Sequence, residues 1–82
     1  MTVTTPRQLR VLVYLAWAAR HHEPASVQAT ANFYGVTLNS ANTAVQALVR
    51  KRLIVRQGAG PRLTAAGWEV VEEAREKAKV TA

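Results

Sequence analysis

The chain has 82 residues, which is enough for one domain built around a single modest core. Its apolar share of 49% is ordinary for a folded domain and argues against intrinsic disorder. The absence of cysteine excludes disulfides, thiol catalysis and thiolate metal sites, and it suits a reducing compartment. We therefore expect residues 1–82 to form one cytoplasmic domain.

The net charge of +6 is unevenly distributed along the chain. Residues 1–64 hold eight Lys or Arg against the single acid Glu23, whereas residues 65–82 hold three basic and four acidic residues. The stretch 50–62 contains no acid and five basic residues: Arg50, Lys51, Arg52, Arg56 and Arg62. Such a patch of one sign predicts a polyanionic partner, with nucleic acid favoured over an anionic membrane surface.

The first helix is expected over residues 6–20, where apolar residues recur at helical spacing. Thr5 is a suitable N-cap, Pro6 fits the first helical position, and Gln8 can complete a capping box. The helix is apolar on nearly all sides, so a second chain or the C-terminal helix should cover it. Its apolar run of nine residues is too short to span a bilayer, and cleavage there as a secretion signal would remove part of the core.

Residues 26–51 have the pattern of a helix-turn-helix. The expected boundaries are Ser26 as the cap of a helix over Val27–Tyr34, Gly35 as its end, and Thr37 or Asn39 as the cap of a helix ending near Lys51 or Arg52. Two helices that cross steeply need small residues where they approach, and Ala31 and Gly35 supply them. Val36 and Ala41 are expected to fill the angle between the two helices.

Residues 53–64 are expected to form a β-hairpin, or wing. Residues 53–55 form a short aliphatic run with two β-branched members, 57–61 have turn composition, and 62–64 can return as the paired strand. Thr64 then caps a final helix over residues 65–79. The predicted fold is therefore mainly α with a small β-hairpin, in the order helix, helix, helix, strand, strand, helix.

The outward face of the helix over residues 37–51 is polar and almost uncharged. Helical spacing directs its apolar residues inward and leaves four hydrogen-bonding side chains outside: Asn39, Asn42, Thr43 and Gln46. Amides present a donor and an acceptor together, as the major-groove edge of adenine requires. We expect these four residues to read bases, although each could be an ordinary surface residue.

The basic residues around this helix and the hairpin suit phosphates, which set affinity and register rather than sequence. The expected backbone contacts are Ser40, Arg50, Lys51, Arg52, Arg56 and Arg62. Gly58, Ala59 and Gly60 form a small tip that either enters an adjacent minor groove or is simply the turn of the hairpin.

Residues 5–67 resemble the winged helix-turn-helix of bacterial regulators of the MarR family and of LexA type. The resemblance lies in residues 47–54, where a recognition helix runs into the first wing strand, and in residues 63–67, where the second wing strand turns into a helix. It implies that helix 37–51 enters the major groove while the wing contacts the flanking backbone.

A homodimer is expected because the first helix is apolar on nearly all sides and a second chain could cover it. Two recognition helices one helical turn apart would then match a pseudo-palindromic site. The apolar residues on the outer helices are the candidate dimer contacts: Val11, Tyr14, Trp17, Ala18, Trp68 and Val71. No catalytic set is recognisable, so we expect neither an enzyme nor a cofactor. His21, His22 and Glu23 are adjacent and cannot easily converge on one metal ion, so no metal site is expected.

The sequence thus predicts a DNA-binding transcriptional regulator, of repressor type, acting as a homodimer. Two alternatives remain open at this point. One is a winged-helix module that binds another protein, as would suit a phage or a mobile element. The other is an architectural or replication-accessory protein that binds DNA without sequence preference.

Overall fold

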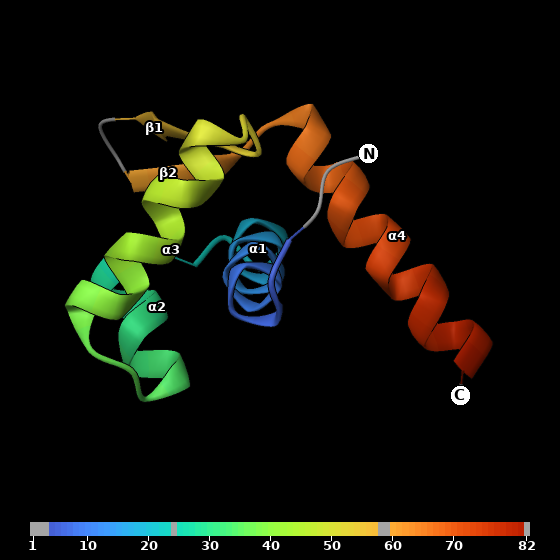
Figure 1. The fold of residues 1–82 in the computed structure, drawn as a ribbon, viewed down its shortest axis with the longest axis horizontal. Coiled ribbons are helices and arrows are strands. Elements are labelled where there is room, and N and C mark those ends of the chain that lie inside the picture. The colour runs from blue at the N-terminus through green and yellow to red at the C-terminus, as the bar shows by residue number, and fades with distance from the viewer. Residues whose placement is uncertain (1–3, 24, 58–59, 82) are drawn as a thin grey trace.

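The computed structural model describes residues 4–23, 25–57 and 60–81. These residues form four helices and a two-stranded antiparallel hairpin: α1 (Pro6–Arg20), α2 (Val27–Tyr34), α3 (Leu38–Arg50), β1 (Ile54–Gln57), β2 (Gly60–Leu63) and α4 (Ala65–Thr81). α1 lies in the middle, with α2 and α3 on one side and α4 on the other (Figure 1). The predicted class, mainly α with a small hairpin, is confirmed, and the arrangement is compatible with a winged-helix-like fold.

The first three helices begin at the predicted caps, where a hydroxyl accepts a hydrogen bond from the backbone N–H three residues later. The three pairs are Thr5 with Gln8 at 3.1 Å, Ser26 with Ala29 at 3.0 Å, and Thr37 with Ser40 at 3.1 Å. The Gln8 side chain also accepts from the backbone N–H of Thr5 at 3.3 Å, which completes the capping box. These ends form locally because each cap and its partner are neighbours in sequence.

The turn between α2 and α3 depends on Gly35, whose φ of 67° lies in the left-handed region that glycine adopts without a steric penalty. Ala31 and Ala41 are both buried, so the small residues lie where the two helices approach. The expectation that Val36 fills this angle is wrong, because 40% of its surface is exposed. The alanines bring the helices close enough that the turn residue remains at the surface.

The paired residues of the hairpin lie nearer to its tip than the sequence predicted. β1 pairs with β2 from Ile54 opposite Leu63 to Gln57 opposite Gly60, so the expected strands 53–55 and 62–64 are both displaced. α3 ends at Arg50, and Arg52 adopts a left-handed φ of 62° that turns the chain before the strand begins. Pro61 does not interrupt the pairing, since a two-stranded sheet has only edge strands, where proline is tolerated.

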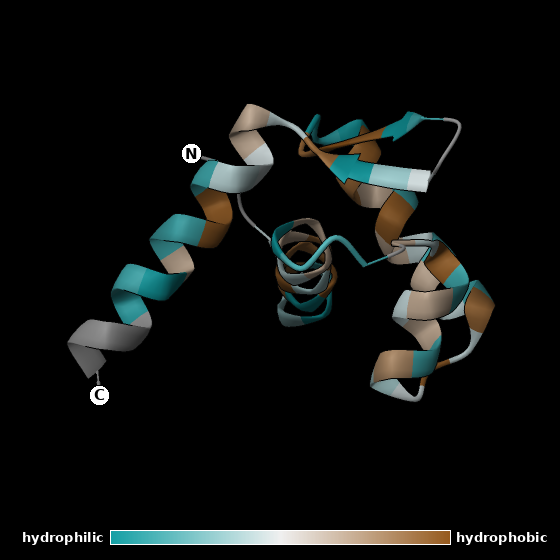
Figure 2. Cartoon of the chain, turned by 180° about the vertical axis from the view of Figure 1, so that it is seen from behind, coloured by the Kyte–Doolittle hydropathy of each residue, from teal (hydrophilic) through white to brown (hydrophobic). Residues whose placement is uncertain are grey.

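The core surrounds α1. Its largest fully buried side chains come from every part of the chain: Leu12, Thr30, Val45, Leu48, Leu53, Ile54 and Val71. α4 contributes Val71 and the half-buried Trp68 near its start and then extends away from the body. Mostly hydrophilic residues follow along its outer part (Figure 2). The helix runs to Thr81 rather than to the predicted residue 79.

Within the described ranges, no helix combines the length and the apolar character needed to cross a bilayer.

Candidate nucleic-acid interface

α3 has two chemically opposite faces. Ala41, Ala44, Val45 and Leu48 are buried against the rest of the domain. The side chains that the sequence predicted to face outward are exposed, with Asn42 half-buried: Asn39, Asn42, Thr43, Gln46 and Arg50. We call Asn39, Asn42, Thr43 and Gln46 the amide face. No acidic residue occurs in the sequence between Glu23 and Glu69, so both α3 and the hairpin are free of negative side chains.

Hydrogen bonds within α3 limit what Thr43 can offer to a ligand. Its hydroxyl donates to the backbone carbonyl of Asn39 at 2.9 Å. Because the single hydroxyl proton is engaged, the oxygen can act toward a ligand only as an acceptor, and the methyl group offers an apolar contact. Thr43 therefore suits a base edge that carries an amino group or a methyl group.

Arg56 is tied to α3. Its Nη2 donates to Oδ1 of Asn42 at 3.0 Å. In the hairpin Arg56 stands opposite the buried Pro61, and residues paired in this way share a face of the sheet. Arg56 therefore stands on the hairpin face that it shares with Pro61, and its exposed side chain reaches α3 from there. Arg62 stands opposite the exposed Val55 on the outer face.

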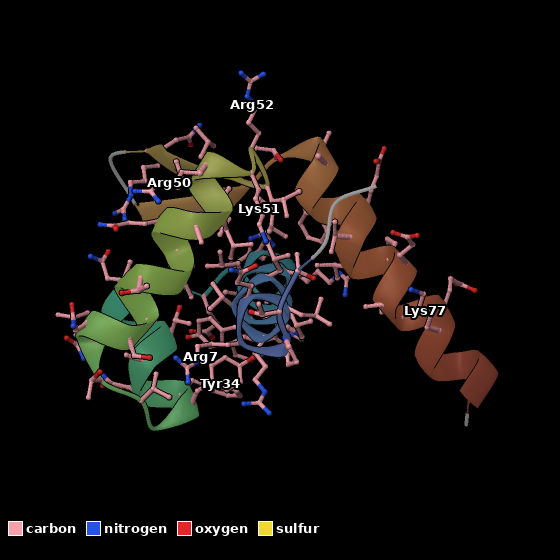
Figure 3. All side chains as sticks on the ribbon, viewed as in Figure 1. Arg7, Tyr34, Arg50, Lys51, Arg52 and Lys77 are labelled. Atoms are coloured by element: carbon pink, nitrogen blue, oxygen red, sulfur yellow. The ribbon has the colours of Figure 1, made fainter. Side chains whose placement is uncertain are left out.

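The basic residues at the end of α3 are spread over different directions (Figure 3). Arg50 points away from α3 beside the hairpin, whereas Arg52 extends away from the body. Lys51 turns toward α1, where its Nζ donates to Oε1 of Gln8 at 2.7 Å. The three side chains therefore do not form the cluster that their adjacency in sequence predicted. Helical rotation and the left-handed backbone of Arg52 separate them.

Arg7 also belongs to this surface, although its position in the sequence predicted no role for it. Its Nη1 donates to Oγ of Ser40 at 3.2 Å, across 33 positions of sequence. A groove of about 380 Å³ separates the start of α1 from α3, lined by residues 5–8 and by Ser40, Thr43, Ala44 and Ala47. The only sequence signal was an unpaired cation in the first turn of a helix, and this does not indicate which element it will meet.

The predicted wing tip is only partly described, because Gly58 and Ala59 lie outside the described residues. Gly60 has a φ of 124°, and a Cβ atom there would lie 2.5 Å from the backbone oxygen of Ala25. Gly60 is therefore packed against the connection between α1 and α2. Of the two alternatives for the tip, this close packing fits Gly60 as part of the hairpin turn, because the backbone of another segment occupies the adjacent space.

Four of the six expected dimer contacts lie inside the chain's own core: Val11, Tyr14, Ala18 and Val71. The expectation that these four residues lie on the surface and contact a second chain is wrong, because other elements of the same chain cover them. Trp17 remains 44% exposed. Trp68 is half-buried, and the guanidinium carbon of Arg20 lies 5.3 Å from the centre of its ring.

A separate aromatic surface lies where α1 meets α2, made of Trp17, Phe33 and Tyr34 around the buried ring of Tyr14. The rings of Tyr14 and Phe33 lie 5.0 Å apart, and Phe33 is 64% exposed. The hydroxyl of Tyr34 donates to the backbone carbonyl of Arg10 at 2.6 Å, and burial raises the pKa of Tyr34 although nearby Arg10 opposes that shift. This surface has a chemistry unlike that of the amide face.

Another concavity, with a volume of about 570 Å³, lies between the end of α1, β2 and α4. Leu15 and Trp68 line it together with the more polar His22, Glu23 and Arg62. It shares no lining residue with the amide face of α3. The surface around α3 is therefore a separate feature of the molecule.

Comparison with known proteins shows a likeness of fold. No family profile matches the chain, and no curated protein sequence matches it. Among solved structures it is similar to the crystal structure of Rv1404 from Mycobacterium tuberculosis, with a TM-score of 0.75 and 27% sequence identity. The match covers 94% of this chain and 56% of Rv1404, so this chain corresponds to a little over half of that protein.

Proposed function

We propose that this chain is a winged helix-turn-helix domain that binds double-stranded DNA and acts as a sequence-specific transcriptional regulator. In this proposal α3 enters the major groove, and the hairpin formed by β1 and β2 is the wing that lies along the flanking backbone. The amide face carries the proposal, because it is exposed, rich in hydrogen-bonding groups and free of acids. An ordinary solvated helix face more often carries Glu and Lys.

The cations around α3 support contact with phosphates on both sides of a groove. Arg50 is exposed at the end of α3, and Arg7 lies beside its start through the bond to Ser40. A duplex whose groove holds α3 would present phosphate oxygens near both ends of the helix, where Arg and Lys neutralise charge and release counterions. The wing adds Arg62 on its outer face.

A homodimer would place two copies of α3 on half-sites one helical turn apart. The observation that favours it is the exposed aromatic surface, since Trp17 and Phe33 are large apolar side chains left open to solvent. The mass of the free protein and of its DNA complex, measured by sedimentation, tests this part of the proposal. A complex containing one copy per site would contradict it.

The binding proposal is tested by titrating the protein against genomic fragments and against random duplex at several salt concentrations. We expect at least one fragment to bind at least ten times more tightly than random duplex. The logarithm of the binding constant should fall linearly with the logarithm of the salt concentration. Equal binding to all duplexes would leave the nonspecific architectural role. Absence of binding at low salt would contradict both DNA functions.

The aromatic surface favours a second candidate, a winged-helix module that binds another protein. Exposed aromatic side chains are common at the centres of protein interfaces. Under this alternative, reversing the charge of Arg50 and Arg52 should leave partner binding largely intact, while Phe33→Ser should weaken it. Under the DNA proposal the charge reversals abolish binding and Phe33→Ser leaves contacts between one domain and DNA unchanged.

A further inference from the structure

The hydrogen bond between the hairpin and α3 determines which hydrogen-bonding groups the amide face offers. Arg56 on β1 and Asn42 on α3 are 14 positions apart, and the fold brings Nη2 of Arg56 to 3.0 Å from Oδ1 of Asn42. Arg56 is exposed, and it stands on the hairpin face that it shares with the buried Pro61, which is the face on which its guanidinium reaches α3. Asn42 is half-buried, which further restricts its side chain.

Chemistry fixes the orientation of this amide. A guanidinium has only donors, so the arm of Asn42 that meets Arg56 must be the carbonyl oxygen. The other arm is the amino group, which has two donors and no acceptor. An unrestrained Asn can turn its amide to suit either kind of base edge, but turning Asn42 would place its amino group against the Arg56 cation.

Guanine and adenine differ in the groups that an amide of fixed orientation would meet in the major groove. In the major groove guanine presents two acceptors, O6 and N7, whereas adenine presents the N7 acceptor and the N6 amino donor. Paired recognition of adenine by Asn needs the carbonyl directed at the N6 amino group, and in this chain one of the two lone pairs of that carbonyl accepts from Arg56, which turns the oxygen toward the hairpin. Donors alone match guanine.

We propose that Arg56 is a positioning residue that holds Asn42 as a hydrogen-bond donor, so that Asn42 selects guanine over adenine at the base pair it contacts. This inference rests on the DNA-binding function proposed above and adds the preferred base. It also revises the expectation from sequence that the amides of α3 are suited to adenine. Arg56 acts through Asn42, and the remaining residues of the amide face read their bases independently.

The test compares the sequences selected from a pool of random duplexes by the natural chain and by four variants. Asn42→Ala identifies the base pair that Asn42 reads, as the position where preference is lost. Arg56→Met removes the donor while keeping a long side chain, and Arg56→Lys restores a group that only donates. Arg62→Met is the matched control, because it removes the same charge from the outer face of the same hairpin.

We expect the natural chain to prefer guanine at that position by about tenfold, within the range for one paired base contact. Arg56→Met should lose this preference or turn it toward adenine, because the amide is then free to rotate. Arg56→Lys should retain it. Arg62→Met should lower affinity for all sequences alike and keep guanine.

Adenine at this position for the natural chain, or guanine retained in Arg56→Met, would overturn the inference while leaving specific DNA binding intact. Should the natural chain select no sequence at all, the proposed function fails and takes this inference with it. A test that needs no Arg56 variant replaces the selected guanine with 7-deazaguanine, which lacks the N7 acceptor. We expect weaker binding by the natural chain but not by Asn42→Ala, and equal losses for both would overturn the inference.

Discussion

The two faces of α3 have opposite relations to the rest of the molecule. The inner face consists of short or aliphatic side chains buried against α1, α2 and β1, where any lost volume leaves a cavity. The outer face consists of amides, a hydroxyl and a cation, where Asn42 accepts from Arg56 and Thr43 donates to the backbone of its own helix. One face therefore determines whether the domain folds, and the other can change its ligand without changing the fold.

The largest effect is expected from the inner face. Leu48 is completely buried, and Leu48→Ala should lower the free energy of unfolding by about 2–5 kcal/mol, the range for such cavities. Gln46→Ala, two residues away on the outer face, should change it by less than about 0.5 kcal/mol. Urea unfolding of both variants measures the contrast, and equal losses would show that the two faces are not separate.

The next effect concerns base preference. Gln46 is exposed on the amide face, and Gln46→Ala should remove about 1–3 kcal/mol of discrimination at one base pair. The measurement compares binding to the selected duplex and to duplexes altered at single positions. If the preference of the variant equals that of the natural chain, Gln46 is a surface residue, and the architectural alternative gains support.

A smaller and more uniform effect is expected from Arg50, at the end of the same outer face. Arg50→Ala should weaken specific and random duplex alike by about tenfold, and it should reduce the slope of affinity against salt by about one. Arg75→Ala is the matched control, because it removes the same charge from α4, where Arg75 lies 3.6 Å from Glu72. A similar loss in both variants would indicate a general charge effect.

The smallest effect, a change in the free energy of unfolding, is expected at Thr37, the cap at the start of α3. The Thr37 hydroxyl accepts from the N–H of Ser40, and Thr37→Ala should lower the free energy of unfolding by about 1 kcal/mol, as for other caps. Thr37→Ser retains the acceptor and should recover most of this loss. Thermal unfolding of the two variants at one pH is sufficient, and an unchanged midpoint in Thr37→Ala would contradict the capping role.

Sequence alone predicted the local features of this protein. Thr5, Ser26 and Thr37 cap their helices because each bonds to a backbone group three residues away, and Gly35 ends α2 because its own φ is positive. Helical spacing also predicted which side of α3 is buried. The hairpin boundaries were less accurate, since the paired strands run from Ile54 to Gln57 and from Gly60 to Leu63.

Tertiary structure alone determined the contacts that join distant segments. Arg56 reaches Asn42 and Arg7 reaches Ser40 because packing places the hairpin and α1 beside α3, and no spacing in the sequence encodes these distances. The same packing buried Tyr14 within the chain and placed Gly60 against Ala25. The residues of the amide face could therefore be named from the sequence, whereas the direction in which Asn42 presents its donors depends on a side chain that only the fold brings to it.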